Sequence, residues 1–365
     1  MSQALQRLVL LGTGTVGSAF VARHARLHSA GIALPPIIAI ANARGYRATN
    51  AADVDAVFAK LRDMPAPRDA AWLAQAGFGR GDILIDASAS DAVADRHAEW
   101  LGNGAHVVTA CKLGQGTSLS RWRAIRAASA ASGGRYGDSA TVGAGLPVLR
   151  SLRELQAGGD RIHGIAGVLS GSLAWLFDRY DGKQPFSRFV REARDAGYTE
   201  PDPRDDLSGE DVRRKIVILA RAAGVELEAD QVDVASLVPE SLAGLPANEL
   251  DAALPLLDEP IRRRYADAYR NGEVLKFIAR LEDGRARVGL DALPREHPLA
   301  SGAGTDNRVA IWSDRYREQP LVVQGPGAGA EVTAAALIDD LLAIVREVGI
   351  ADTTQAPPLR LVAVT

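Results

Sequence analysis

The stretch LVLLGTGTVGSAFVARHARL at residues 8–27 predicts a buried strand, a glycine turn and a helix. Its glycines form the pattern G-x-G-x-x-G. In this pattern the first glycine permits the tight turn, the second lets a pyrophosphate approach the backbone, and the third allows close helix packing. We therefore predict a dinucleotide site here; the alternative is a glycine turn without a ligand. The predicted cofactor-binding residues of the turn are Gly12, Thr13, Gly14, Thr15, Val16 and Gly17.

Strands and helices continue to alternate after this turn. Residues 35–45, 82–88 and 105–112 read as strands, and residues 92–104 as a helix. Such alternation predicts right-handed crossovers and a parallel sheet of the Rossmann type. The fold class is therefore α/β.

The pattern changes after about residue 138. A mainly helical run is followed by residues 273–293, which predict an antiparallel pair turned at Asp283–Gly284. We expect an α+β domain at residues 139–324, and the family resemblance given below implies that it serves substrate binding, catalysis and dimerisation. Residues 320–350 again read as strand, glycine turn and helix, so residues 1–138 and about 325–365 are expected to form the dinucleotide-binding domain.

The composition excludes several classes of protein. The formal net charge of −3 gives no basic field for nucleic acid or an anionic membrane. No segment approaches the ~20 apolar residues that span a bilayer. Cys111, the single cysteine among 365 residues, rules out an intramolecular disulfide and fits a reducing cytosol, so we expect a cytoplasmic protein.

The end of the second predicted strand bears on the choice of dinucleotide. An NAD site usually has Asp or Glu there, to accept a hydrogen bond from the ribose 2′-hydroxyl. This chain has Asn42, followed by Arg44 and Arg47, and guanidinium groups suit a 2′-phosphate. NADP is therefore favoured over NAD, with solvated loop charges as the alternative interpretation of the two arginines.

The stretch YTEPDPRDDLSGEDVRRK at residues 198–215 is an acidic loop leading into a helix. Ser208 is the predicted N-cap, with Asp211 at the third helical position in a capping-box arrangement. Asp211 and Lys215 stand four apart, which fits either a surface ion pair or a lysine held charged at a cleft. Crowded carboxylates invite a cation such as a substrate ammonium group, and Lys112 ends a strand at the edge where ligands bind.

Together these motifs resemble the homoserine dehydrogenase family over nearly the whole chain. The resemblance rests on LLGTGTVGSAF, LIDASAS with HVVTACK, ATVGAGLPVLRSL, GVLSGSLAWLF, GYTEPDPRDDLSGEDVRRK and GPGAGAEVTAAALIDDL. Cys111 departs from the asparagine that the family usually has. No aspartokinase domain is expected before the match and no ACT-type regulatory domain after it.

The resemblance implies an activity and a set of site residues. The activity is the NAD(P)-dependent interconversion of L-aspartate 4-semialdehyde and L-homoserine, in threonine, methionine and isoleucine biosynthesis, by a homodimer. Lys215, Lys112 and Asp211 would be catalytic, with Lys215 as the proton donor. The implied substrate-binding residues are Glu200, Asp206, Gly171, Ser172 and Tyr198. The further cofactor-binding residues are Asn42, Arg44, Ser88, Ala89, Lys112, Gly325, Gly327 and Ala328.

The resemblance also implies a sodium or potassium site formed by the backbone carbonyls of Val142, Ala144 and Leu146. Relatives often add an acidic side chain where this chain has Ser139. Two other functions stay open: reduction of a related amino-acid semialdehyde, and a catalytically silent NADP-binding sensor. A scaffold would need neither the glycine turn nor the lysine and carboxylate set.

Overall fold

The computed structural model describes residues 7–50, 52–65 and 70–348. The strands are β1 (Arg7–Leu11), β2 (Ile37–Asn42), β3 (Gly45–Ala48), β4 (Asp82–Asp86), β5 (His106–Thr109), β6 (Tyr136–Gly137), β7 (Ile162–Val168), β8 (Asp233–Val234), β9 (Glu273–Glu282), β10 (Arg285–Pro294), β11 (Asp306–Ser313) and β12 (Leu321–Pro326). The α-helices are α1 (Thr15–Ser29), α2 (Val54–Arg62), α3 (Asp91–Gly102), α4 (Leu119–Ser132), α5 (Val148–Ala157), α6 (Gly171–Arg179), α7 (Phe186–Asp195), α8 (Arg204–Leu207), α9 (Glu210–Ala222), α10 (Glu240–Ala243), α11 (Ala247–Ala253), α12 (Asp258–Arg270) and α13 (Ala330–Val348).

The chain divides into two compact units. Within the described residues, the first unit comprises the chain up to Gly114, Arg123–Ala140 and the part from Gly329 on. The second unit comprises Gln115–Trp122 and Thr141–Ala328. Of the expected dinucleotide-binding domain, residues 1–6 and 349–365 lie outside the described residues.

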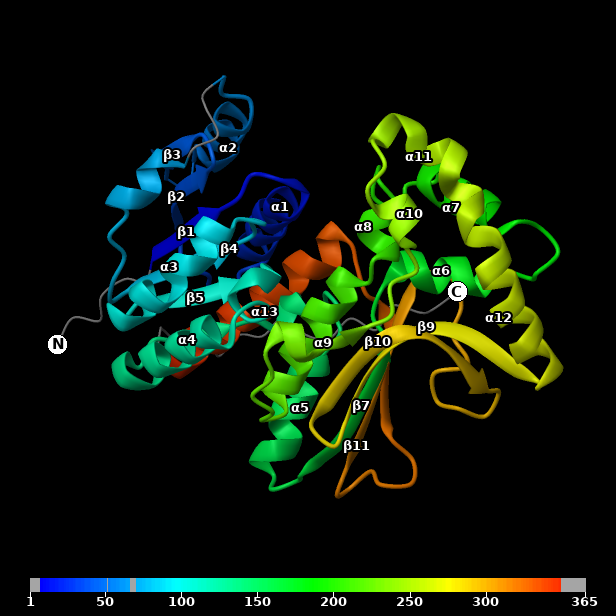
Figure 1. Ribbon diagram of the computed structural model, residues 1–365. Coiled ribbons are helices and arrows are strands. Elements are labelled where there is room, and N and C mark those ends of the chain that lie inside the picture. Colours follow the sequence, from blue (N-terminus) through cyan, green and yellow to red (C-terminus); the bar gives the residue numbers. More distant parts are fainter. Residues whose placement is uncertain (1–6, 51, 66–69, 349–365) are drawn as a thin grey trace. The chain divides into compact units, whose positions relative to one another are not determined.

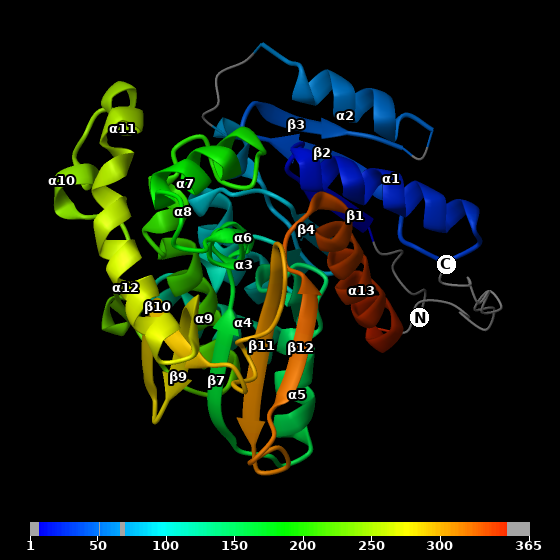
Figure 2. The same ribbon diagram turned by 90° about the vertical axis from the view of Figure 1, so that its right-hand side faces the viewer.

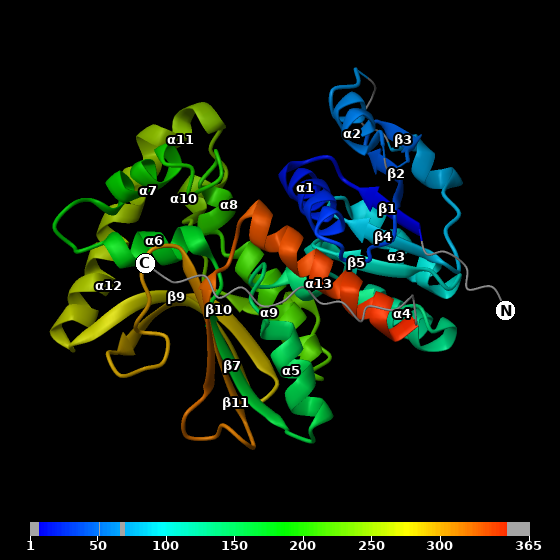
Figure 3. The same ribbon diagram turned by 180° about the vertical axis from the view of Figure 1, so that it is seen from behind.

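The first unit is built on a sheet of order β3-β2-β1-β4-β5-β6. The pairs β1–β2, β1–β4, β4–β5 and β5–β6 are parallel, as the alternation of strands and helices predicted. The helix α13 packs along α1 and β5 (Figures 1 and 3), and buries Ala334, Leu337 and Leu341. From β1 the strands continue through β2 on one side of the sheet and through β4 on the other, so the strand order reverses at β1. In such sheets ligands bind in the crevice at the carboxyl end of the strands at this point.

Two strands of this sheet, β3 and the short β6, were not predicted from the sequence. β3 pairs antiparallel with β2, from Ala39 with Ala48 to Asn42 with Gly45. The Asn42 side chain accepts a hydrogen bond from the backbone N–H of Arg44 at 2.7 Å, which turns the chain back immediately. The expected loop around Arg47 is therefore an edge strand.

The second unit is built on a sheet of order β12-β11-β7-β9-β10-β8. Its pairs are antiparallel except β10–β8, and Figure 2 shows β7, β11 and β12 side by side. The predicted hairpin is confirmed, since Asp283 and Gly284 both have positive φ between β9 and β10. Alternate residues of β9, among them Phe277, Ala279 and Leu281, join the main hydrophobic core with residues of α6, α9 and α12.

A buried arginine forms hydrogen bonds that hold the short segment Gln115–Trp122 within the second unit. Arg221 of α9 is 2% exposed and donates to the carbonyls of Gln115, Thr117 and Leu227 at 2.6–3.1 Å. Burial lowers the pKa of its guanidinium to about 10, while Glu228 opposes that shift. The carbonyls satisfy a charge that would otherwise be costly to bury. None of the described helices is long and apolar enough to cross a membrane.

Candidate functional site

The glycine turn between β1 and α1 is shaped by contacts that only glycine tolerates. Gly12 has φ +113°, and a Cβ there would lie 2.6 Å from the carbonyl oxygen of Ala87. A Cβ on Gly17 would lie 2.1 Å from the carbonyl oxygen of Gly12, so close packing requires glycine at this position. At Gly14, in contrast, no heavy atom lies within 4 Å of the position that a Cβ would take. Gly12 and Gly17 are therefore required by close packing, whereas the space beside Gly14 is not filled by protein atoms.

The amino end of α1 fits an anionic group in that space. Gly14 is the N-cap residue, no side chain caps the helix, and no acidic residue stands in its first turn. Gly14 and Thr15 are exposed, with Thr13 and Val16 half-buried beside them. Because the first N–H groups of a helix and its dipole favour negative charge, this end can hold a pyrophosphate.

Asn42 lies at the predicted place, at the carboxyl end of β2. Its amide nitrogen donates to the Thr13 hydroxyl at 2.8 Å and to the carbonyl of Leu61 at 3.0 Å. The amide nitrogen of Asn42 is therefore already hydrogen-bonded within the protein, and its bond to Thr13 stabilises the glycine turn. Arg44 donates to the carbonyl of Arg62 at 2.8 Å, whereas Arg47 is exposed on β3.

Ser88 and Ala89 follow β4, and a buried network holds Ser88. The Asp86 carboxylate accepts from the Ser88 hydroxyl at 2.6 Å and from the Thr109 hydroxyl at 2.9 Å. The Nε2 of His97 lies 3.2 Å from the same carboxylate, and its Nδ1 lies 3.1 Å from the Tyr136 hydroxyl. Asp86 and His97 are fully buried, so the loop at this sheet edge is rigidly supported.

Lys112 begins a short 3-10 helix just after β5, at the same carboxyl edge of the first sheet. Its neighbour Cys111 is 3% exposed. Burial raises the pKa of the Cys111 thiol to about 12, and Asp86 contributes to the shift. The thiol is thus a protonated, buried side chain beside Lys112.

Lys215 in the second unit is buried, with 7% of its surface exposed. Its ammonium group donates to the carbonyl of Leu169 at 2.6 Å and lies 2.7 Å from a carboxylate oxygen of Asp211. The predicted pairing of Asp211 and Lys215 is present. A simple surface ion pair does not describe it, because the lysine is enclosed and its tip is held from two sides.

A second group of predicted residues surrounds the Asp206 carboxylate. One of its oxygens accepts from the Ser172 hydroxyl at 2.6 Å, and the other accepts from the backbone N–H of Glu200 at 2.8 Å. Ser170, the N-cap of α6, lies 2.9 Å from the Ser172 hydroxyl. The turn Leu169–Ser172 therefore contacts both Lys215 and Asp206, which brings an ammonium group and a carboxylate to one place.

The remaining predicted residues of this region line the same turn and loop. A Cβ on Gly171 would lie 3.0 Å from the carbonyl oxygen of Thr305, so the turn passes close to its neighbour. Tyr198 is 45% exposed and packs on Trp175, with ring centroids 5.2 Å apart. In the same loop, Arg204 pairs with Asp202 at 2.6 Å.

The predicted N-cap at Ser208 is wrong. Ser208 has helical dihedrals and ends α8, whereas Gly209, with φ +79°, is the N-cap of α9. The Ser208 hydroxyl donates to the carbonyl of Asp205 at 3.0 Å and accepts from the N–H of Glu210 at 3.3 Å. A left-handed break between two helices thus replaces the capping box.

Gly327, just after β12, lies against a side chain that contacts the Leu169 carbonyl of the Lys215 site. A Cβ on Gly327 would lie 1.9 Å from the Asn307 side chain, while Gly325 has φ +152° and Ala328 ends the second unit. Asn307 donates to the carbonyl of Leu169 at 3.4 Å. Its buried amide oxygen has no hydrogen-bond partner in the part of the chain that is described.

The carbonyls expected to bind a cation belong to an unusual turn. Gly143 and Ala144 both have positive φ, and the carbonyl of Leu146 accepts from the N–H of Val148 at 2.8 Å. Ser139 donates from its N–H and its hydroxyl to Asp340, at 2.8 and 2.7 Å. No group of three or more His, Cys, Asp or Glu side chains is placed to hold a metal ion among the described residues. A cation at Val142, Ala144 and Leu146 would therefore depend on backbone oxygens.

Comparison with known protein families covers both units. Residues 147–342, more than half of the chain, match the family model described as homoserine dehydrogenase. The chain belongs to the homoserine dehydrogenase family. Residues 12–137 match the model described as the NAD-binding domain of homoserine dehydrogenase.

Individual homoserine dehydrogenases agree with this placement. A homoserine dehydrogenase of Paracoccidioides brasiliensis is 38% identical over 75% of this chain and 77% of its own. A bifunctional aspartokinase/homoserine dehydrogenase 2 of maize is 45% identical over 73% of this chain, which spans only 29% of the maize protein. A crystal structure described as a candidate homoserine dehydrogenase of Archaeoglobus fulgidus superposes with a TM-score of 0.76 at 25% identity, covering 93% of this chain and 99% of its own.

Several groups that support this homoserine dehydrogenase site were not identified from the sequence. The carbonyl of Leu169 could not be identified from the sequence, because every residue has a backbone carbonyl and the residue type does not show which one accepts a hydrogen bond. Asp86 stands in the quoted LIDAS stretch, and a buried acid at a strand end is the signal that would have marked it. Asn307 carries no such signal.

Proposed function

We propose that this chain catalyses the NAD(P)-dependent interconversion of L-aspartate 4-semialdehyde and L-homoserine. The observation that carries the proposal is the buried Lys215 ammonium, held by Asp211 and by the carbonyl of Leu169. The turn that supplies this carbonyl also positions Ser172 against Asp206. Family membership supports the same activity.

In the proposed mechanism Lys215 acts on the oxygen of the substrate. During reduction of the aldehyde this oxygen gains negative charge, which the ammonium group stabilises before donating a proton. Asp211 keeps that group oriented. The bound nicotinamide supplies the hydride chemistry. Asp206 and Glu200 hold the substrate ammonium group, and Gly171, Ser172 and Tyr198 surround the substrate.

Lys112 is proposed as the second catalytic lysine, from its place at the carboxyl edge of the first sheet. Ser88 and Ala89 flank the cofactor, with Ser88 positioned by Asp86. Gly325, Gly327 and Ala328 are proposed to contact the nicotinamide.

NADP is proposed as the preferred dinucleotide. Asn42 stands where a carboxylate would bind the ribose of NAD, and its amide is already engaged by Thr13 and Leu61. Arg44 and Arg47 supply positive charge at the same edge, which suits a 2′-phosphate.

We further propose that Na⁺ or K⁺ binds the carbonyls of Val142, Ala144 and Leu146, and that the enzyme is a cytoplasmic homodimer. The resemblance to the family is the support for these three points. A dependence of activity on either cation, in a cation-free buffer, would test the first of them.

The test is the turnover of Lys215→Ala, followed by nicotinamide absorbance with homoserine. We expect turnover to fall at least about 10²–10³-fold, because one such donor commonly contributes that much, while NADPH still binds. Arg214→Ala removes the same charge from the neighbouring position and is the matched control. Near-normal turnover of Lys215→Ala would refute the assignment. Activity only on other hydroxy amino acids would favour a related semialdehyde reductase, and NADPH binding without any turnover of the wild type would favour the sensor.

A further inference from the structure

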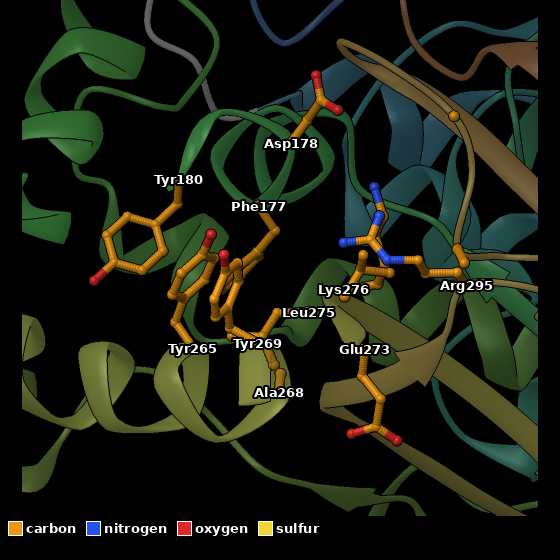
Figure 4. Close-up of a pocket in the computed structure, with 13 residues that line it drawn as sticks. Phe177, Asp178, Tyr180, Tyr265, Ala268, Tyr269, Glu273, Leu275, Lys276 and Arg295 are labelled. Atoms are coloured by element: carbon orange, nitrogen blue, oxygen red, sulfur yellow. The ribbon is translucent and has the colours of Figure 1, made fainter. Parts of the chain in front are cut away.

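A cavity of about 250 Å³ lies in the second unit, between the carboxyl end of α6, the helix α12 and the start of β9 (Figure 4). Its wall shares no residue with the set formed by Lys215, Asp211, Ser172 and Asp206. Ser172 begins α6 and Asp178 is near its end, so the two places are separated by about 9 Å along the helix axis. The cavity is therefore distinct from the proposed substrate site.

Lys276 is the most unusual residue of this cavity. It lines the wall, is only 8% exposed, and its ammonium group makes no hydrogen bond within the described residues. Burial lowers the pKa of Lys276 below its ordinary value, Asp178 opposes this shift, and Arg308 adds to it. The Lys276 Nζ is not among the fully buried atoms that lack a partner, so an anion that enters the cavity can reach it and pair with it.

The acidic residues of the wall do not supply that anion. Asp178 accepts from the backbone N–H of Gly304 at 3.1 Å, and Glu273 accepts from the Asn271 amide at 3.4 Å. Figure 4 shows the Glu273 carboxylate pointing away from Arg295. Neither carboxylate forms a close ion pair with Lys276 or Arg295 within the described residues, although Asp178 acts on Lys276 at longer range, so both cations can pair with an added anion.

The other wall is aromatic. Tyr265 and Tyr269 stack with ring centroids 6.2 Å apart, and Figure 4 shows both hydroxyls directed toward Phe177. Lys276 and Arg295 come from the opposite side in the same view. Tyr180 packs edge-on against Tyr265 at 5.3 Å. Two cationic groups thus face an apolar wall that carries two phenolic donors.

We propose that this cavity binds a small organic carboxylate, whose charged group pairs with Lys276 and Arg295 and whose apolar body packs against Phe177, Tyr180 and Tyr265. A compact apolar lining with a few convergent polar groups is typical of small-molecule sites. The apolar wall favours an organic carboxylate over a bare inorganic anion.

The test uses benzoate as the probe, with the full chain and saturation-transfer NMR titrations. Benzamide has the same ring and no charge, so it should bind at least about tenfold more weakly, since a charge-assisted hydrogen bond is lost. Lys276→Met should weaken benzoate binding by a similar factor. It replaces a buried ammonium with an apolar chain of similar length, so folding should survive, and the NMR spectrum of the free variant checks this.

Two controls separate this cavity from other sites. Lys183→Met removes an exposed lysine, whose side chain is 83% accessible, and should leave benzoate binding unchanged. Lys215→Ala should also leave it unchanged, which distinguishes the cavity from the proposed substrate site. Equal binding of benzoate and benzamide, equal binding by wild type and Lys276→Met, or binding of inorganic phosphate without benzoate would each overturn the proposal.

Discussion

Alanine substitutions at Gly17 and Gly14 would separate packing from ligand contact in the glycine turn. The Gly17 Cβ would lie 2.1 Å from the Gly12 carbonyl oxygen, a backbone atom that cannot rotate away. Relief requires α1 to shift from β1 by roughly 1 Å, and overpacking of this kind costs about 1–3 kcal/mol or more. The higher helix propensity of alanine stabilises the folded state by up to about 1 kcal/mol, which offsets part of this cost. We therefore expect the free energy of unfolding to fall by about 2 kcal/mol, a decrease in Tm of roughly 4–8 °C for a unit of this size.

Gly14→Ala is the matched partner of this variant. Gly14 has φ −82°, which alanine adopts readily, and its Cβ would meet no atom within 4 Å. Stability should change by less than about 0.5 kcal/mol, since the weaker N-cap and the less flexible unfolded chain offset each other. Affinity for NADPH should nevertheless fall at least about tenfold, a loss of about 1.4 kcal/mol, because the methyl group occupies the space assigned to the pyrophosphate.

Thermal unfolding by circular dichroism and NADPH fluorescence titration measure the two effects independently. Unchanged NADPH affinity in Gly14→Ala would refute the assignment of the pyrophosphate to this helix end. Unchanged stability of Gly17→Ala would refute the packing argument.

Three further outcomes are expected. Arg44→Ala should raise the KM for NADPH about tenfold without changing that for NADH, whereas Arg26→Ala, at the far end of α1, should change neither. Asp206→Asn should raise the KM for homoserine by about tenfold or more by removing the charge that faces the substrate ammonium, with the KM for NADPH as the internal control; an unchanged homoserine KM would remove Asp206 from the site. Cys111 should resist thiol reagents at about pH 8, because its raised pKa keeps it protonated and the thiolate is the nucleophile; rapid labelling of the native protein, at the rate seen in denaturant, would contradict this.

The elements with strong local signals could be predicted from the sequence. The strand, glycine turn and helix at residues 8–27 follow from apolar runs and glycine spacing, and the hairpin at Asp283–Gly284 follows from its turn residues. The parallel pairing of β1, β2, β4 and β5 in the first sheet follows from the alternation of strands and helices along the chain. β3 was missed because residues 45–48 show no clear alternation of apolar and polar side chains, and their pairing with β2 follows a tight turn at Asn42.

The sequence was enough to predict which residues belong to the candidate site, but not which of them contact one another. The spacing of Asp211 and Lys215 gave their pairing, since residues four apart share a helix face. The N-cap assignment failed at Ser208 because two helices meet there, at the left-handed Gly209, where a Cβ would lie 3.0 Å from the Phe277 ring. Contacts between distant segments, such as those of Lys215 with Leu169 or Ser139 with Asp340, depend on tertiary structure and have no local signature.

The position of α13 in the sequence has a consequence for when the first unit can finish folding during synthesis. This helix packs on α1 and its Asp340 anchors Ser139, although about two hundred residues of the second unit separate these partners along the chain. Domains generally fold as they leave the ribosome, amino end first, at about 5–20 residues per second. The apolar surface of the first unit that α13 covers therefore stays uncovered for about 10–40 seconds after Ser139 has been made, until α13 has been synthesised.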